Sequence, residues 1–264
     1  MWGFEMAALP QFVELQEHAQ NYLLSLLQVE EYRQLRSHFQ YVDFKLGDVV
    51  YDFAEHQCHV YFPTSCVVSL LYTTEDGSTA EVGLTGNDGA VGVGLLLGGE
   101  IATNRAVVQV AGGAFKINAF IARKEFARGR SFQTLLLRYT QALITQISQT
   151  AVCNRLHSME KRLCRWLLLS HDRVRSDDLL MTQEFISNML GGRRESVTVA
   201  AGRLQDAELI YYARGHIRIL DRSGLEAGAC ECYRIVKSEV DRLFRDVGSQ
   251  GVRNLVQKAA YQAS

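Results

Sequence analysis

The apolar residues of this chain change their spacing near residue 120, and that change limits the folds it can adopt. Between about residues 40 and 120, short runs rich in Val, Leu, Tyr and Phe are separated by glycine and aspartate. Short strands at regular spacing predict a small sandwich or jelly roll. Beyond residue 120 the apolar residues follow a helical period. We therefore expect an α+β protein in which a β-roll precedes a helical region.

The predicted strands end at residues that favour turns. Glu75-Asp76-Gly77 is a strong hairpin signal, because glycine adopts a positive φ at no steric cost. A helix is expected ahead of the strands, over residues 20–38. The strands themselves are expected over residues 41–44, 49–53, 59–62, 67–73, 79–84, 106–110 and 114–117.

Residues 122–157 predict an unusually long helix. They contain no proline, and their single glycine is Gly129. A helix of about 25–30 residues needs a partner along its length, because isolated helices gain most of their stability from packing. A second copy of the chain is the simplest partner, and the alternative is the chain's own β-roll. The expected homodimer interface consists of one apolar stripe: Leu136, Tyr139, Leu143, Ile147 and Thr150.

The charges are divided unevenly between the two halves. The formal net charge is −1, but residues 1–120 carry −9 and residues 121–264 carry +8. A basic half fits a polyanion such as nucleic acid, whereas the alternative is a set of solvated helices rich in arginine. No apolar run approaches the roughly 18–20 residues of a spanning helix. Residues 1–11 do not resemble a signal peptide. We therefore expect a cytoplasmic protein with no membrane partner.

The cysteines and histidines suggest neither a metal site nor catalysis. None of the six cysteines forms a C-x-x-C pair, so reduced, buried thiols are expected. Cys153 could also meet its symmetry mate at a dimer axis. His56 and Cys58 would point away from His59, because side chains alternate along a strand. No nucleophile triad or phosphate loop is present. We expect no catalytic residue, no metal and no cofactor.

Residues 182–206 predict two short helices joined by a glycine turn. Thr182 is a candidate N-cap, and Gly191-Gly192 would end the first helix. The second helix would bury Val197, Ala201 and Leu204. Such a pair is a helix-turn-helix, unless it is an ordinary helical hairpin packed on a core.

A hairpin is predicted directly after the second helix. Residues 209–213 and 216–220 are two apolar runs, and Arg214-Gly215 lies at the tip between them. A hairpin in this position is a wing, which would lie against a phosphate backbone. Asp221 or Ser223 would cap one last helix.

Together these segments resemble the Crp/Fnr family of bacterial transcription regulators. The most specific match runs from Thr182-Gln183-Glu184 to Gly191 and then Arg194-Glu195-Ser196-Val197. The resemblance implies a cyclic-nucleotide-binding-like β-roll over 1–120, a dimerisation helix over 121–157 and a winged helix-turn-helix over 158–264. It also implies a homodimeric, sequence-specific regulator that binds a near-palindromic site in double-stranded DNA and contacts RNA polymerase.

The resemblance assigns roles to individual residues. Arg194, Glu195, Thr198 and Val199 would read bases, and Val199 stands where the cyclic-AMP receptor branch has an arginine. Arginine recognises guanine O6 and N7, and glutamate accepts from cytosine N4. The expected contacts to the DNA backbone are Thr182, Arg193, Ser196 and Arg214.

The sensor half departs further from the family. Gly92, Gly94 and Arg105 would mark an effector pocket, but Gly92 replaces the ribose-binding glutamate of cyclic-nucleotide binders. We therefore expect Arg105 to form a structural ion pair, and the effector is left unassigned. Two other functions fit parts of the chain. One is a cupin-like metal enzyme with His56 and His59 as ligands, and the other is a ligand-binding module that recognises protein.

Overall fold

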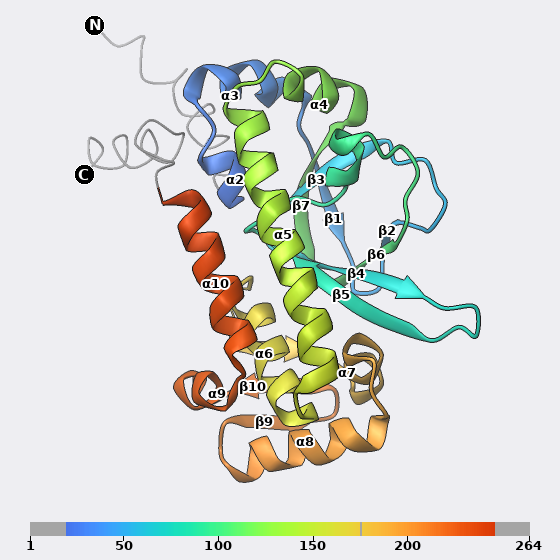
Figure 1. Ribbon diagram of the computed structural model, residues 1–264, viewed down its shortest axis with the longest axis vertical. Helices are drawn as coiled ribbons and strands as arrows, with labels where there is room; N and C mark the ends of the chain where they lie inside the picture. The colour runs from blue at the N-terminus through green and yellow to red at the C-terminus, as the bar shows by residue number, and fades with distance from the viewer. Residues whose placement is uncertain (1–19, 175, 246–264) are drawn as a thin grey trace, which may run out of the picture.

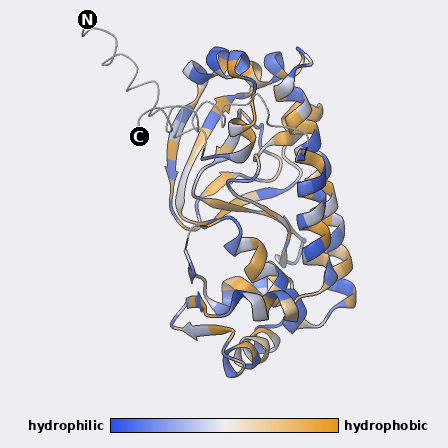
Figure 2. Ribbon diagram, turned by 90° about the vertical axis from the view of Figure 1, so that its left-hand side faces the viewer, coloured by the Kyte–Doolittle hydropathy of each residue, from blue (hydrophilic) through white to orange (hydrophobic). Residues whose placement is uncertain are grey.

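A computed structural model describes residues 20–174 and 176–245 of the chain. A β-roll lies above a helical domain, and one long helix runs beside both (Figures 1 and 2). Residues 1–11, which do not resemble a signal peptide in sequence, lie outside the described residues. Within the described residues, no helix is both long and apolar enough to cross a bilayer.

Two antiparallel sheets form the β-roll, with strand orders β1-β7-β3 and β2-β6-β4-β5. The strands are β1 (Gln40–Phe44), β2 (Val49–Tyr51), β3 (His59–Pro63), β4 (Val67–Thr73), β5 (Thr79–Thr85), β6 (Arg105–Val110) and β7 (Gly112–Asn118). The predicted helix over residues 20–38 is divided into α2 (Tyr22–Ser25), α3 (Val29–Leu35) and the 3-10 turn η1 (Arg36–His38). A second 3-10 turn, η2 (Val93–Leu97), follows β5.

Strand β4 is buried on both faces. Val68 and Leu70 belong to the core inside the β-roll, because alternate side chains point to the same side of a strand. Val67 and Leu71 point the other way and join the core of the helical domain. This explains why the strand reads as a nearly continuous apolar run rather than as an alternation.

The long helical segment contains a break near Gly129, where φ is +71°. It consists of α4 (Ala119–Phe126) and α5 (Ser131–Leu156), and α5 is 26 residues long. The left-handed conformation at Gly129 ends the first helix, as glycine commonly does. The second helix therefore starts in a new direction and runs down the β-roll (Figure 1).

The predicted dimer stripe on α5 faces the chain's own β-roll in this structure, which is the alternative considered for this helix. Tyr139 is buried, and its hydroxyl lies 2.7 Å from the hydroxyl of Thr85 on β5. Gln146 exchanges two hydrogen bonds with the backbone of Leu84. The buried or half-buried side chains of the stripe are Leu136, Tyr139, Leu143, Ile147 and Thr150. A helical apolar period shows that one face is covered but does not identify the covering surface.

The helical domain contains a winged helix-turn-helix followed by two more helices. Its elements are α6 (Met159–His171), β8 (Asp178–Leu180), α7 (Gln183–Leu190), α8 (Arg194–Asp206), β9 (Ile210–Ala213), β10 (His216–Ile219), α9 (Arg222–Gly228) and α10 (Glu231–Phe244). Strand β8 adds to the predicted hairpin and makes a three-stranded sheet. Asp221 caps α9, as predicted, but the expected single last helix is split between α9 and α10. Helix α10 packs antiparallel to α5 (Figure 1).

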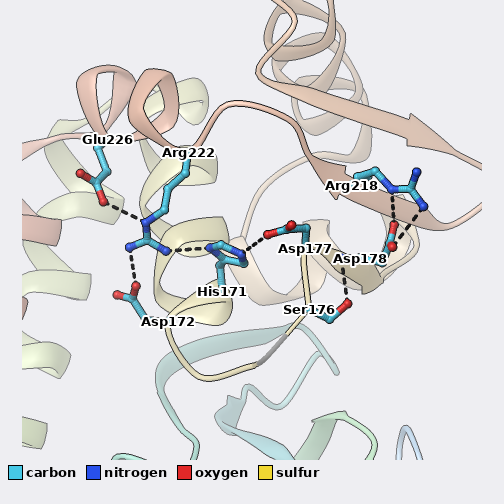
Figure 3. A network of polar contacts seen from close by, with 8 residues as sticks. All are labelled: His171, Asp172, Ser176, Asp177, Asp178, Arg218, Arg222 and Glu226. Carbon is cyan, nitrogen blue, oxygen red and sulfur yellow. Dashed lines mark hydrogen bonds and ion pairs between the residues drawn. The ribbon is translucent and has the colours of Figure 1, made fainter.

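A polar network fixes the end of α6 to α9 and β8 (Figure 3). Arg222 on α9 forms an ion pair with Asp172 at 2.5 Å and donates to Nδ1 of His171 at 2.7 Å. Because Nδ1 accepts, Nε2 of His171 carries the proton and donates to Asp177 at 2.8 Å. The last helices are thereby held at a defined angle to α6.

The helical domain docks on the outer face of the β4–β5–β6 sheet. Trp166 of α6 is fully buried there, and its indole N–H donates to the Glu81 carboxylate at 3.0 Å. Arg173, also buried, forms a bidentate pair with Asp88 at 2.6 and 3.1 Å. Burial raises the pKa of Glu81 to about 7, and the second oxygen of that carboxylate has no hydrogen-bond partner.

We expect Glu81→Gln to flatten the pH dependence of stability. The native state holds the Glu81 proton up to about pH 7, whereas the ordinary pKa of the group is 4.5. The contribution of the protonated Glu81 side chain to the stability of the fold is therefore complete below pH 4.5 and is lost as pH rises through 7. Glutamine keeps an acceptor for Trp166 without the charge. At pH 8 the free energy of unfolding of the variant should therefore exceed that of the wild type by up to roughly 3 kcal/mol.

Urea unfolding at pH 5 and pH 8 measures this effect. Glu75→Gln, in the exposed hairpin turn, is the matched control and should behave as the wild type. An unchanged pH dependence in Glu81→Gln would contradict the assignment.

Candidate DNA-binding surface and effector pocket

The turn between α7 and α8 is built by local interactions that the sequence predicts. The Thr182 side chain accepts a hydrogen bond from the backbone N–H of Phe185 and caps α7. Gly191 ends α7 in the left-handed conformation at φ +56°. Arg193 occupies the N-cap position of α8 without a side-chain capping bond. The side chain of Arg193 is therefore free to point outward from the start of α8.

Helix α8 buries one face and exposes the other at the lower edge of the molecule (Figure 1). Val197, Ala201 and Leu204 are each no more than 2% exposed, as expected for the inner face. The predicted base-reading and backbone-contacting residues of this helix are all exposed. They are Arg193, Arg194, Glu195, Ser196, Thr198 and Val199.

A hollow of about 320 Å³ lies between the start of α8 and the wing. Thr182, Arg194, Arg214 and Tyr212 are among its lining residues. Arg214 sits at the tip of the hairpin, where Arg214 and Gly215 both have positive φ, as a two-residue type I′ turn requires. The structure thus brings two predicted DNA contacts from the wing and from α7 next to Arg194.

The other side of α8 borders a second hollow, of about 350 Å³, beside the start of α6. Glu195, Ser196 and Val199 line it. Thr198 is different, because its hydroxyl lies 3.2 Å from the side-chain oxygen of Gln183 on α7 and 2.9 Å from the carbonyl oxygen of Arg194. Thr198 therefore joins the two helices. A base contact made by Thr198 would have to be compatible with this interaction.

Three arginines around these hollows have no partner within the chain. Among the residues that the structure describes, the side chains of Arg193, Arg194 and Arg214 make no hydrogen bond or ion pair. By contrast, Arg218 on the same wing is paired with Asp178 at 2.7 Å (Figure 3). Unpaired, exposed guanidinium groups at a helix N-terminus form a surface of positive potential.

The β-roll contains a separate cavity of about 220 Å³ that opens toward α5. Gly92 and Gly94 line it together with Leu143 and Ile147 of the long helix. Gly92 has φ +90°, and a Cβ there would lie 2.9 Å from the carbonyl oxygen of His59. A glutamate could not occupy this position without moving the backbone. The cavity is mainly apolar, with Tyr and amide side chains at its edge.

Arg105, a candidate residue of the effector pocket in the sequence, does not line this cavity. Its Nε lies 3.4 Å from a carboxylate oxygen of Asp52, and both side chains are about 40% exposed. An ion pair is the role that the sequence favoured for Arg105. The described lining of the cavity includes no Arg or Lys that could hold a phosphate.

The structure also gathers residues that sequence reasoning did not connect. Cys153 lies 3.5 Å from Cys230 of the same chain and is fully buried, so it does not face a symmetry mate. Cys232 and His157 adjoin this pair. A spacing rule for metal sites misses the group, because Cys230 and Cys232 form a C-x-C pair distant in sequence from Cys153.

Comparison with known proteins agrees with this architecture. Residues 161–227 match the family described as the Crp-like helix-turn-helix domain. No curated protein matches the sequence. The fold is similar to that of FixK2 from Bradyrhizobium japonicum, with a TM-score of 0.61 and 15% identity over 73% of this chain and 98% of that chain.

Two further structures show the same likeness. A transcriptional regulator of the CRP family from Thermus thermophilus has a TM-score of 0.61 and 18% identity over 71% of this chain and 96% of that chain. The c-di-GMP responsive global regulator CLP from Xanthomonas campestris has a TM-score of 0.53 and 13% identity over 69% of this chain and 94% of that chain. The predicted resemblance and fold class are therefore confirmed. The chain has the fold of Crp/Fnr regulators and contains a Crp-like helix-turn-helix domain.

We expect calorimetry to show no tight binding of cyclic AMP. The cavity presents no cation to the phosphate, and Arg105 is engaged by Asp52. Arg105→Ala should change the free energy of unfolding by no more than about 1 kcal/mol, because exposed ion pairs contribute little. Tight binding that disappears in Arg105→Ala would contradict this interpretation.

Proposed function

We propose that this chain is a homodimeric, sequence-specific DNA-binding transcription regulator whose β-roll senses an effector. The observation that carries the proposal is the group of unpaired arginines, Arg193, Arg194 and Arg214, around the exposed start of α8. Their position within a Crp-like helix-turn-helix domain supports it. The proposed division of labour is sensing by residues 1–120, dimerisation by 121–157 and DNA binding by 158–264.

In this proposal α8 enters the major groove and the wing lies on the phosphate backbone. Arg194 and Glu195 at the first turn of α8 would read base edges, together with Val199, which is 56% exposed and suits the methyl group of thymine. Ser196, Thr182 and Arg193 would contact phosphates near the helix start, where the helix dipole favours anions. The role requires a location where DNA is present, which is the expected cytoplasm.

We expect Arg194→Ala and Arg214→Ala to affect DNA binding in different ways. Arg194→Ala should cost about 1–3 kcal/mol and relax preference at one base pair in each half-site. Arg214→Ala should weaken binding to all sequences alike and make the salt dependence shallower, because it removes a phosphate contact. Binding of each variant to a randomised DNA library at several salt concentrations separates these effects.

Arg218→Ala is the matched control, because Asp178 already neutralises this arginine on the same wing. It should leave both affinity and sequence preference nearly unchanged. The groove assignment is wrong if Arg194→Ala lowers affinity uniformly while Arg214→Ala changes the preferred sequence.

The proposed dimer uses the outward face of α5 rather than the stripe that the sequence favoured. Leu137, Ile144 and Val152 are 45%, 52% and 43% exposed and recur at spacings of about two helical turns. An apolar row of this kind on a long helix suits pairing with the same helix of a second copy. A two-fold dimer would present two α8 helices to half-sites about 34 Å apart, which calls for a near-palindromic site.

We expect the double variant Leu137→Asp/Ile144→Asp to be monomeric by light scattering. Both side chains are exposed in the subunit, so the circular dichroism spectrum should not change. Phe120→Asp, at a residue of α4 that is 74% exposed, is the control and should remain dimeric. A dimeric double variant would rule out this interface.

The effector pocket in this proposal is the cavity lined by Gly92, Gly94, Leu143 and Ile147. Its apolar walls favour a small, largely uncharged effector. The regulator would then act on transcription through contact with RNA polymerase, in keeping with the family resemblance. The cupin-like alternative finds no support, because in the part of the chain that the structure describes His56, Cys58 and His59 form no group that could hold a metal. A protein-binding module would leave the unpaired arginines unexplained.

A further inference from the structure

Three cysteines and a histidine from distant parts of the sequence meet where α10 packs against the end of α5. Their ligand atoms, the sulfurs of Cys153, Cys230 and Cys232 and a ring nitrogen of His157, all lie within 4.8 Å of one another. The three cysteines form a small buried cluster of their own, and His157 is 14% exposed. The proposed DNA-binding function does not use any of these four residues.

The local structure explains how each ligand reaches the cluster. Cys153 and His157 are four residues apart at the end of α5, so their side chains lie on one face. Cys230 is the N-cap residue of α10, and Cys232 follows in the first turn. Both cysteines of α10 come after the matched Crp-like domain, which ends at residue 227.

The distances suit a single tetrahedral metal ion. The sulfurs of Cys153 and Cys230 are 3.5 Å apart, and the Cys232 sulfur is 3.6 Å from Nδ1 of His157. With Zn–S bonds of about 2.3 Å and Zn–N bonds of about 2.0–2.1 Å, tetrahedral ligand atoms are separated by about 3.5–3.8 Å. A disulfide needs sulfurs about 2.05 Å apart. Thiolate and imidazole ligands together favour zinc over magnesium or calcium.

The surrounding charges also suit a metal with three thiolates. Such a site carries a net charge of −1, because three thiolates outweigh one divalent cation. Arg165 is 3% exposed, and its Nε has no hydrogen-bond partner. The Arg165 guanidinium interacts electrostatically with Cys153. The buried guanidinium would balance the charge of the complex.

Glu231 supplies the outer contact that histidine ligands commonly have. Its carboxylate lies 3.5 Å from Nε2 of His157, while Nδ1 of the same ring faces Cys232. A carboxylate on the far nitrogen fixes the ring orientation and strengthens the imidazole as a ligand. Nδ1 is therefore the nitrogen available to the metal.

We propose that Cys153, His157, Cys230 and Cys232 bind one zinc ion in a structural Cys₃His site. Four protein ligands leave no open position, so the site serves stability rather than catalysis. The metal would join the start of α10 to the end of α5, directly beside the α5–α6 junction from which the helix-turn-helix domain continues. Zinc bound at this site would correct the expectation that the chain binds no metal.

The test is metal analysis of the full chain purified under reducing conditions from zinc-supplemented medium. We expect about one zinc per chain, as a mononuclear site requires. Cobalt exchanged into the site should give the visible bands of tetrahedral cobalt together with thiolate-to-cobalt charge transfer. Chelation should lower the melting temperature, because the metal binds the folded state.

Matched variants identify the ligands. Cys232→Ala should lose the zinc, the cobalt spectrum and the effect of chelator. Cys164→Ala, another fully buried cysteine, on α6 and outside the cluster, should keep all three. If Cys232→Ala does not fold, the zinc content and cobalt spectrum of the wild type decide the question. The proposal is overturned by a wild type without zinc, by zinc retained in Cys232→Ala, or by a Cys153–Cys230 disulfide under reducing purification.

Discussion

The contact between α6 and the outer face of the β4–β5–β6 sheet determines where the proposed DNA-binding surface lies. Trp166 and its neighbours on α6 are removed from water together with Val67, Leu71 and Leu84 of the β-roll. Burial of apolar area on this scale is the main favourable contribution to such a contact. Because α8 packs on α6, a change in the seating of α6 would also change the position of α8. The Glu81 carboxylate lies inside this contact with one oxygen unpartnered.

Helix α5 contributes to the core of the β-roll and also connects it to the other parts of the molecule. Its inner face closes the β-roll cavity through Leu143 and Ile147, and its outer face carries the exposed Leu137 and Ile144. Its C-terminal end supplies Cys153 and His157 to the cluster with α10. An occupant of the cavity would therefore touch the same helix that is proposed to pair with a second subunit. Coupling between the occupant of the cavity and the pairing of two subunits needs two discrete arrangements of α5.

The sequence predicted those features that depend on near neighbours. Strand β4 was predicted at its observed limits, and the roles of Thr182 as a cap and Gly191 as a helix end follow from their own backbone chemistry. The partner of α5 could not be predicted, because a helical period is the same whether a β-roll or a second helix covers it. The cysteine cluster depends on α10 folding back along α5, which no local pattern encodes. Within the candidate DNA surface, exposure was predicted well, but the bond from Thr198 to Gln183 was not.

Strand β4 has consequences for any attempt to divide the protein. Leu70 faces the interior of the β-roll and Leu71 faces the helical domain, so one strand completes two cores. A fragment that ends before α6 would expose the Leu71 side of the sheet to water, and a fragment that begins at α6 would expose Trp166. Large exposed apolar patches promote aggregation. The two halves are thus distinct in architecture but interdependent in solubility. An exchange of the helical domain between proteins of this fold would succeed only if the outer residues of β4 were exchanged with it.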